Sequence, residues 1–218
     1  MSSQSDTAKV MTTTWPSLKN GVAISWLVVG AAGLLEGAYG RTQYLGDAIS
    51  YLNVSRAISA FDWAGIFDPM WNPGYPALIA IARAIAPSTP DGEWYAITLL
   101  NWIIFLGAFA AWRNLVRTSI AFCMPGSEAL YKHPVATWTT GCVFLGCNLG
   151  LDNVSSVYPD LLITTFFMLA GGQLLRLIER QTLSSATSLG AILGLGIWIK
   201  GVFAAFSGAF LLTLFLDC

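Results

Sequence analysis

Long apolar runs separated by shorter polar stretches dominate the pattern of this chain. Four of the runs cover about Asn20–Tyr39, Trp94–Trp112, Val135–Leu151 and Leu161–Leu175. Each approaches the ~20 apolar residues that a helix needs to cross a bilayer. A last stretch, Ala186–Leu216, is too long for one helix across a hydrocarbon core of about 30 Å, so we divide it at Lys200–Gly201. The pattern predicts an all-α integral membrane protein with about six transmembrane helices.

The longest polar stretch, residues 40–93, joins the first two apolar runs. It holds a predicted helix over Asp47–Phe61 and a shorter one over Ala77–Ala86, which contains Arg83 and suits a place at the membrane interface. Prolines separate the two helices. Since a connector without a function of its own could be far shorter, this loop is the first candidate for chemistry.

The basic residues give the chain a predicted orientation. Residues 1–18 are rich in Ser and Thr, as expected of a disordered tail, and residues 19–218 form the predicted transmembrane domain. The tail and the connections 113–133 and 176–185 carry the Lys and Arg residues that the positive-inside rule places in the cytoplasm. Both ends of a chain with six crossings are then cytoplasmic.

Acidic residues mark the opposite side of the membrane. They outnumber bases in the 40–93 loop and in the turn at 152–160, which are therefore predicted to lie outside. Four polar residues from three separate connections fall on this face: Asp47, Asp152, Asp160 and Lys200. Their convergence, more than any one of them, indicates a functional site.

Composition excludes several other classes. Apolar residues make up 55% of the 218 and charged residues only 11%, whereas soluble domains carry about 25% charged residues. A net charge of −1 without a Lys/Arg cluster argues against a nucleic-acid partner. The single histidine and the absence of a CxxC motif give no reason to predict a metal site. We interpret Cys142 and Cys147, inside an apolar run, as small core hydrophobes.

Each candidate residue also has an ordinary structural explanation. Asp47 could cap the helix that follows it, and Asp160 could be the acid of a helix start after Pro159. Lys200 could extend its ammonium group from a helix end to the membrane surface. Asp152 and Arg56 could be solvated loop charges. These alternatives stay open at the level of sequence.

Several short motifs resemble a known family. They are Gly46–Leu52 (GDAISYL), Asp62-Trp63, Trp71–Pro76 (WNPGYP), Tyr158–Leu162 (YPDLL) and the segment from Leu189 to Lys200 with its LG pairs. In this order, across roughly residues 20–205, they resemble the GT-C superfamily of membrane glycosyltransferases. The likeness is to the family 39-like enzymes of bacteria, relatives of the protein mannosyltransferases and of the lipid A aminoarabinose transferase.

The resemblance implies a GT-C-like transmembrane domain that transfers a sugar from a polyprenyl-phosphate donor. The acceptor would be a hydroxyl of a glycan, lipid or protein on the extracytoplasmic face of the bacterial inner membrane. Asp47 would be the catalytic base of an inverting displacement, and Lys200 would face the departing lipid phosphate. Asp160 would orient the acceptor or Lys200, or bind a divalent cation in members that use one. Tyr51, Arg56 and Asp152 are the predicted substrate-binding residues.

The enzymes of this family are usually considerably longer than 218 residues. The chain is therefore expected to correspond to an N-terminal half, with a separate C-terminal half as a candidate partner. A second hypothesis is a non-catalytic fragment or membrane subunit that keeps the GT-C fold. A transporter is less expected, because the first four apolar runs lack mid-membrane charges and paired broken helices.

Overall fold

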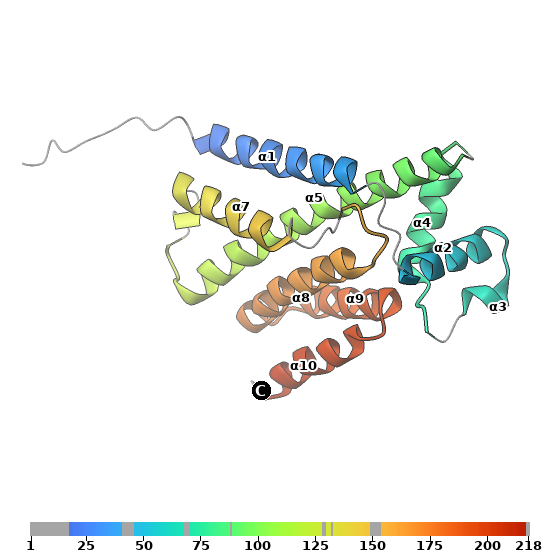
Figure 1. Cartoon of the computed structure of the whole chain (residues 1–218). Coiled ribbons are helices and arrows are strands. Elements are labelled where there is room, and N and C mark those ends of the chain that lie inside the picture. Colours follow the sequence, from blue (N-terminus) through green and yellow to red (C-terminus); the bar gives the residue numbers. More distant parts are fainter. Residues whose placement is uncertain are drawn as a thin grey trace, which may run out of the picture.

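The structure, a computed structural model, describes residues 18–40, 46–67, 70–87, 89–127, 130–131, 133–148 and 154–216. Within these residues the regular structure is entirely α-helical, as the sequence predicts (Figure 1). The helices are α1 (Leu18–Tyr39), α2 (Gly46–Ser59), α3 (Trp63–Ile66), α4 (Gly74–Ala84), α5 (Pro90–Cys123), α7 (Pro134–Asn148), α8 (Asp160–Arg180), α9 (Leu183–Ile199) and α10 (Phe203–Leu216). Residues 1–17 of the predicted tail lie outside the described part.

Three of the described helices, α1, α5 and α8, are long and apolar enough to cross a membrane. Helices α9 and α10 are apolar but have only 17 and 14 residues. Helix α7 has 15 residues, which at 1.5 Å per residue is about 22 Å and short of a hydrocarbon core of about 30 Å. The three long apolar helices indicate a membrane protein. The prediction of six crossings stays a prediction.

Helix α5 is the centre of the bundle and packs against α1, α4, α7 and α8. In Figure 1 it runs between α1 and α7 on one side and α8, α9 and α10 on the other. The core between α1, α5 and α7 is aromatic: the rings of Phe105 and Phe109 each lie 5.1 Å from that of Phe144. All three side chains are fully or almost fully buried, which makes this cluster the apolar centre that fixes the helices on α5.

The two ends of the bundle hold different residues. The start of α8 lies at one end, here named the Asp160 end, and its last turn lies at the other, the Arg180 end. At the Arg180 end Arg113 of α5 donates a hydrogen bond to Ser25 of α1 (3.3 Å). At the Asp160 end Gly37 of α1 lies against Thr98 of α5, so α1 and α5 are antiparallel. Figure 1 shows α2, α3 and α4 gathered at the Asp160 end.

The structure agrees with one predicted helix boundary and moves another. The break at Lys200–Gly201 is confirmed, because α9 ends at Ile199 and Lys200 is extended (φ −153°, ψ 124°). Helix α5, in contrast, continues past the predicted end at Trp112 to Cys123. Arg113 does not stop it, since its guanidinium donates to the Tyr131 hydroxyl (3.0 Å) and lies over the ring of Phe109.

The interpretation of Cys142 and Cys147 as core residues is wrong. Both side chains are exposed. The buried positions of α7 are Thr137, Gly141, Phe144 and Asn148, spaced three and four residues apart. This spacing defines one face of the helix, and the two cysteines lie off it.

Candidate functional site

The first candidate residue, Asp47, lies in the first turn of α2. The helix begins at Gly46, so Asp47 is inside the helix rather than at its N-cap, where a carboxylate still interacts favourably with the helix dipole. Its side chain is exposed. Tyr51 follows one turn later on the same side of α2 and is buried. Helix α2 packs on α4, and this contact holds the Asp47–Tyr51 pair at the Asp160 end.

Two further candidates, Asp160 and Lys200, form an ion pair. The Lys200 Nζ donates to Asp160 Oδ1. Asp160 belongs to the first turn of α8, whereas Lys200 lies in the extended break between α9 and α10. The side chains are 58% and 37% exposed, so the pair adds little stability by itself. The pair places the ammonium group of Lys200 over the start of α8.

The loop motif Trp71–Pro76 holds the Lys200 break in place. The Asn72 Nδ2 donates to the Ile197 carbonyl (3.0 Å), and its Oδ1 accepts from the Gly201 backbone N–H (3.2 Å). One amide thus pairs with backbone groups on both sides of Lys200. Because a helix end leaves such groups without intrahelical partners, Asn72 stabilises the break and sets the path of the chain there.

Gly74 brings the start of α4 into contact with the end of α9. A Cβ at this position would lie 2.8 Å from Ile199 Cα and 2.9 Å from the Trp198 carbonyl oxygen. Both are backbone atoms, which cannot rotate away as a side chain could. The glycine therefore allows an approach that any other residue would prevent.

A buried network joins the same motif to the segment before α8. The Tyr75 hydroxyl donates to Asn101 Oδ1 of α5 (2.9 Å). The Asn101 Nδ2 then donates to the carbonyls of Val154 (3.2 Å) and Ser156 (2.8 Å). A buried amide with three hydrogen bonds is well satisfied. The network places residues 154–159, and hence Asp160 after them, relative to α4 and α5.

The electrostatics of Tyr51 indicate that the candidate residues influence one another. Burial, and then the negative charges of Asp160 and Asp47, raise the pKa of the Tyr51 hydroxyl to about 12. The pKa of Tyr158 is also raised, by burial and by the same two carboxylates. Both hydroxyls are therefore protonated at neutral pH and can donate hydrogen bonds. The Tyr51 ring is held edge-on by Trp71 (5.0 Å) and Tyr75 (5.8 Å).

The structure separates Arg56 from this group. Arg56 lies about 14 Å further along α2 than Asp47, near its other end. There it donates to Asn53 (3.2 Å) and lies 3.8 Å from Glu93 of α5. Arg83 lies 3.1 Å from the same Glu93 oxygen and donates to Ser55. Arg56 thus belongs to a separate group of charges that joins α2, α4 and α5. Asp152 lies outside the described residues.

Sequence reasoning missed the residues that position the site. Asn72 and Tyr75 are inside the quoted motif, but their partners on α9 and α5 are more than twenty residues away in sequence. Asn101 had a usable signal, since it is a polar amide near the middle of an apolar run. Within the described residues, no three His, Cys, Asp or Glu side chains are grouped as a metal site requires.

Comparisons with family models, with curated proteins and with solved structures gave no match to this chain.

Proposed function

We propose that this chain is the membrane part of a GT-C-like glycosyltransferase that uses a polyprenyl-phosphate sugar. The observation that supports the proposal most is the ion pair between Asp160 and Lys200, beside Tyr51 and Asp47. These residues come from three separate parts of the chain and gather at one end of the bundle. A cation and carboxylates at the end of membrane-length helices suit a donor whose phosphate lies at the membrane surface.

In the proposed reaction the acceptor oxygen forms a bond to the anomeric carbon while the bond from that carbon to the phosphate oxygen breaks. The acceptor proton passes to the Asp47 carboxylate, and the bonding electron pair leaves with the polyprenyl phosphate. One displacement inverts the anomeric centre. Asp47 is exposed, so an acceptor can reach it, and general-base catalysis of this kind contributes about 10²–10⁴-fold in rate.

Lys200 has the donors for the departing phosphate. An ammonium group carries three N–H donors, and one of them goes to Asp160. The other two have no partner among the described residues. They can therefore donate to phosphate oxygens as negative charge grows on them, which is the form of stabilisation that accelerates such steps. In this proposal Asp160 orients Lys200, and the protonated Tyr51 hydroxyl donates to the donor or to Asp47.

The second candidate is a non-catalytic membrane subunit that keeps the same fold. One observation favours this second candidate. Asp160 and Lys200 already pair with each other, and Asn72 bonds the backbone on both sides of Lys200. In that case the charges only join α8 to the α9–α10 junction. The two candidates predict different results when Asp47 is changed, because Asp47 takes no part in the contact between α8 and the α9–α10 junction.

The test is sugar transfer from labelled polyprenyl-phosphate hexoses and pentoses in membranes that contain the chain, with and without its neighbouring reading frame. Asp47→Asn keeps the size of the side chain but cannot accept the proton, so transfer should fall by about 10²–10⁴-fold while the protein still inserts and folds. The matched control is Asp62→Asn. Asp62 caps α3 by accepting from the Ala64 N–H (3.2 Å), and asparagine caps equally well, so transfer should hardly change.

Transfer by Asp47→Asn at the wild-type rate would remove Asp47 from the mechanism. No transfer by the wild-type chain under either condition, with folded protein in the membrane, would favour the non-catalytic subunit.

A further inference from the structure

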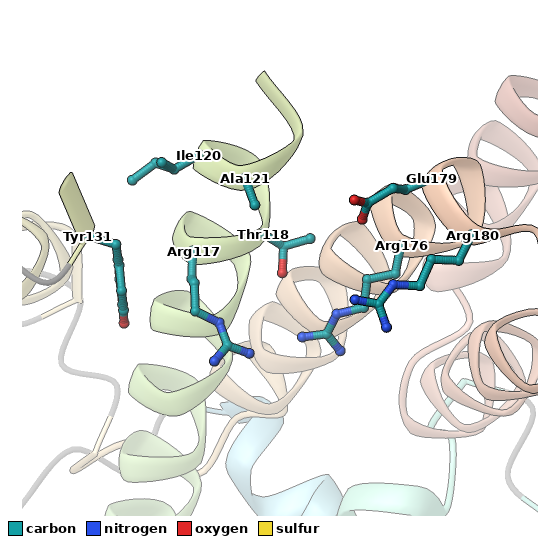
Figure 2. Close-up of a pocket in the computed structure, with 8 residues that line it drawn as sticks. All are labelled: Arg117, Thr118, Ile120, Ala121, Tyr131, Arg176, Glu179 and Arg180. Atoms are coloured by element: carbon teal, nitrogen blue, oxygen red, sulfur yellow. The ribbon is translucent and has the colours of Figure 1, made fainter. Parts of the chain in front are cut away.

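A basic pocket lies between α5 and α8 at the Arg180 end of the bundle (Figure 2). Its volume is about 370 Å³, at the lower end of the range for small-molecule sites. Three arginines line it, Arg117 from α5 and Arg176 and Arg180 from α8, together with Tyr131 and Glu179. None of these residues contributes to the proposed transferase site, which is at the opposite end of the same helices.

Two of the arginines are held side by side by one neutral group. Arg176 and Arg117 both donate to Oδ1 of Asn114, and the distance from the Arg117 Nη2 to this oxygen is 3.2 Å. Arg176 also donates to Gln173 (3.4 Å). Asn114 itself is confined by α8, because a Cβ at Gly172 would lie only 3.1 Å from its Nδ2. The amide thus fixes two guanidinium groups close together, although like charges repel.

Among the described residues, no carboxylate pairs with the three arginines of the pocket. Within the described residues, no carboxylate lies within ion-pairing distance of any of the three arginines. Glu179 lines the pocket, but in Figure 2 its carboxylate lies apart from the three guanidinium groups, which extend toward the same part of the pocket. The described residues therefore supply no anion that pairs with these three arginines.

The length of α8 bears on where the pocket would lie relative to the lipid headgroups. Helix α8 has 21 residues, about 32 Å, which matches the thickness of the hydrocarbon core. Asp160 begins this helix, and Arg176 and Arg180 are in its last two turns. If α8 spans the bilayer, the arginines therefore lie where the phosphates of one leaflet are. Basic pockets between membrane helices at this level are known to bind anionic headgroups.

We propose that this pocket binds a phosphate group, supplied by the headgroup of an anionic membrane phospholipid. Guanidinium groups in a fixed arrangement are well suited to phosphate oxygens, since each can donate two parallel hydrogen bonds. The bound phosphate offsets the repulsion between Arg117 and Arg176 and joins α5 to α8. The inference does not depend on the proposed transferase function.

The test measures the thermal unfolding midpoint of the purified full chain in a neutral detergent as lipid is added. The probes are short-chain phosphatidylglycerol, short-chain phosphatidylcholine, glycerol 3-phosphate and inorganic phosphate. Phosphatidylglycerol should raise the midpoint, as a ligand that binds only the folded state does. It should do so at a concentration about tenfold or more below that of the zwitterionic lipid, because a charged hydrogen-bonded partner is worth at least this factor.

Single arginine variants show whether the pocket is responsible. Arg176→Gln and Arg180→Gln should each raise the half-effective phosphatidylglycerol concentration by about tenfold or more. The matched control is Lys19→Gln, which removes one positive charge from the first turn of α1 at the same end of the bundle and should change the value by about twofold at most. Arg180 makes no hydrogen bond or ion pair with the described residues, so its variant decides the matter if Arg176→Gln fails to fold.

Each remaining outcome counts for or against the proposal. If glycerol 3-phosphate or inorganic phosphate acts at the same concentration as phosphatidylglycerol, the phosphate site stands and the lipid source is wrong. Equal effects of the two lipids, or equal responses of the arginine variants and Lys19→Gln, would overturn the site.

Discussion

Replacing Gly74 by alanine tests the contact between the loop motif and the Lys200 break. Gly74 begins α4 and lies against the last residues of α9. The added Cβ would be 2.8 Å from Ile199 Cα and 2.9 Å from the Trp198 carbonyl oxygen. Since both are backbone atoms, α4 or the end of α9 must move, and the hydrogen bonds of Asn72 on either side of Lys200 move with it.

The expected loss follows from two opposing effects. Adding a methyl group where no space exists costs about 1–3 kcal/mol. Replacing glycine by alanine in a helix gains up to about 1 kcal/mol, and less at the first residue of a helix. We therefore expect Gly74→Ala to lower the free energy of unfolding by about 1–2 kcal/mol.

The matched control is Gly194→Ala in α9, where no atom lies within 4 Å of the added Cβ. It should stabilise the protein by up to about 1 kcal/mol. For a chain of this size 1 kcal/mol corresponds to about 2–4 °C, so a difference of about 1–3 kcal/mol between the two variants should appear as roughly 2–12 °C in thermal midpoint. Equal midpoints for the two variants would show that α4 does not press on the end of α9, and the account of how Lys200 is held would be wrong.

Two further predictions concern tyrosines near the site. Tyr75→Phe removes the hydrogen bond to Asn101 Oδ1 (2.9 Å) and should lower the free energy of unfolding by about 1–3 kcal/mol, because the acceptor stays buried. Thermal unfolding checks this against the control Tyr39→Phe, which changes an exposed side chain. Similar midpoints for the two variants would contradict the prediction. Tyr51 has a folded-state pKa of about 12 against 10.0 for the free group, so its contribution to stability is complete below pH 10 and is lost as the pH rises through 12. Tyr51→Phe should therefore make the unfolding midpoint less dependent on pH over this range, and an unchanged dependence would show that Tyr51 titrates normally.

A helix break can be predicted from the sequence where a single charged residue interrupts an apolar stretch. Lys200 interrupts an apolar stretch, and a lysine has a high cost inside a bilayer; the predicted helix break there is confirmed. The proximity of Asp160 and Lys200 could be anticipated from the alternation of apolar runs, which returns the chain to the same end after each pair of helices. The structure brings the two residues together as an ion pair.

Other features depend on contacts that a pattern along the chain does not contain. The aromatic residues at its ends predict an apolar segment that ends at Trp112. Helix α5 continues past that point, where Tyr131 and Ser25 satisfy the Arg113 guanidinium beside the helix. Arg56 is a predicted substrate-binding residue, but the length of α2 separates it from Asp47. The role of Asn72 could not be predicted because its partners are 125 and 129 residues away.

That separation has a consequence for biosynthesis. Residues 197–201 leave the ribosome long after Asn72 and Gly74, so the last two helices pack against a loop that has already been synthesised. Lys200 sets the position of the α9–α10 break, and Asn72 of the loop holds the backbone on both sides of it. A defect in the loop should therefore appear first as misassembly of the C-terminal helices, where quality-control proteases would act, while the early helices insert normally.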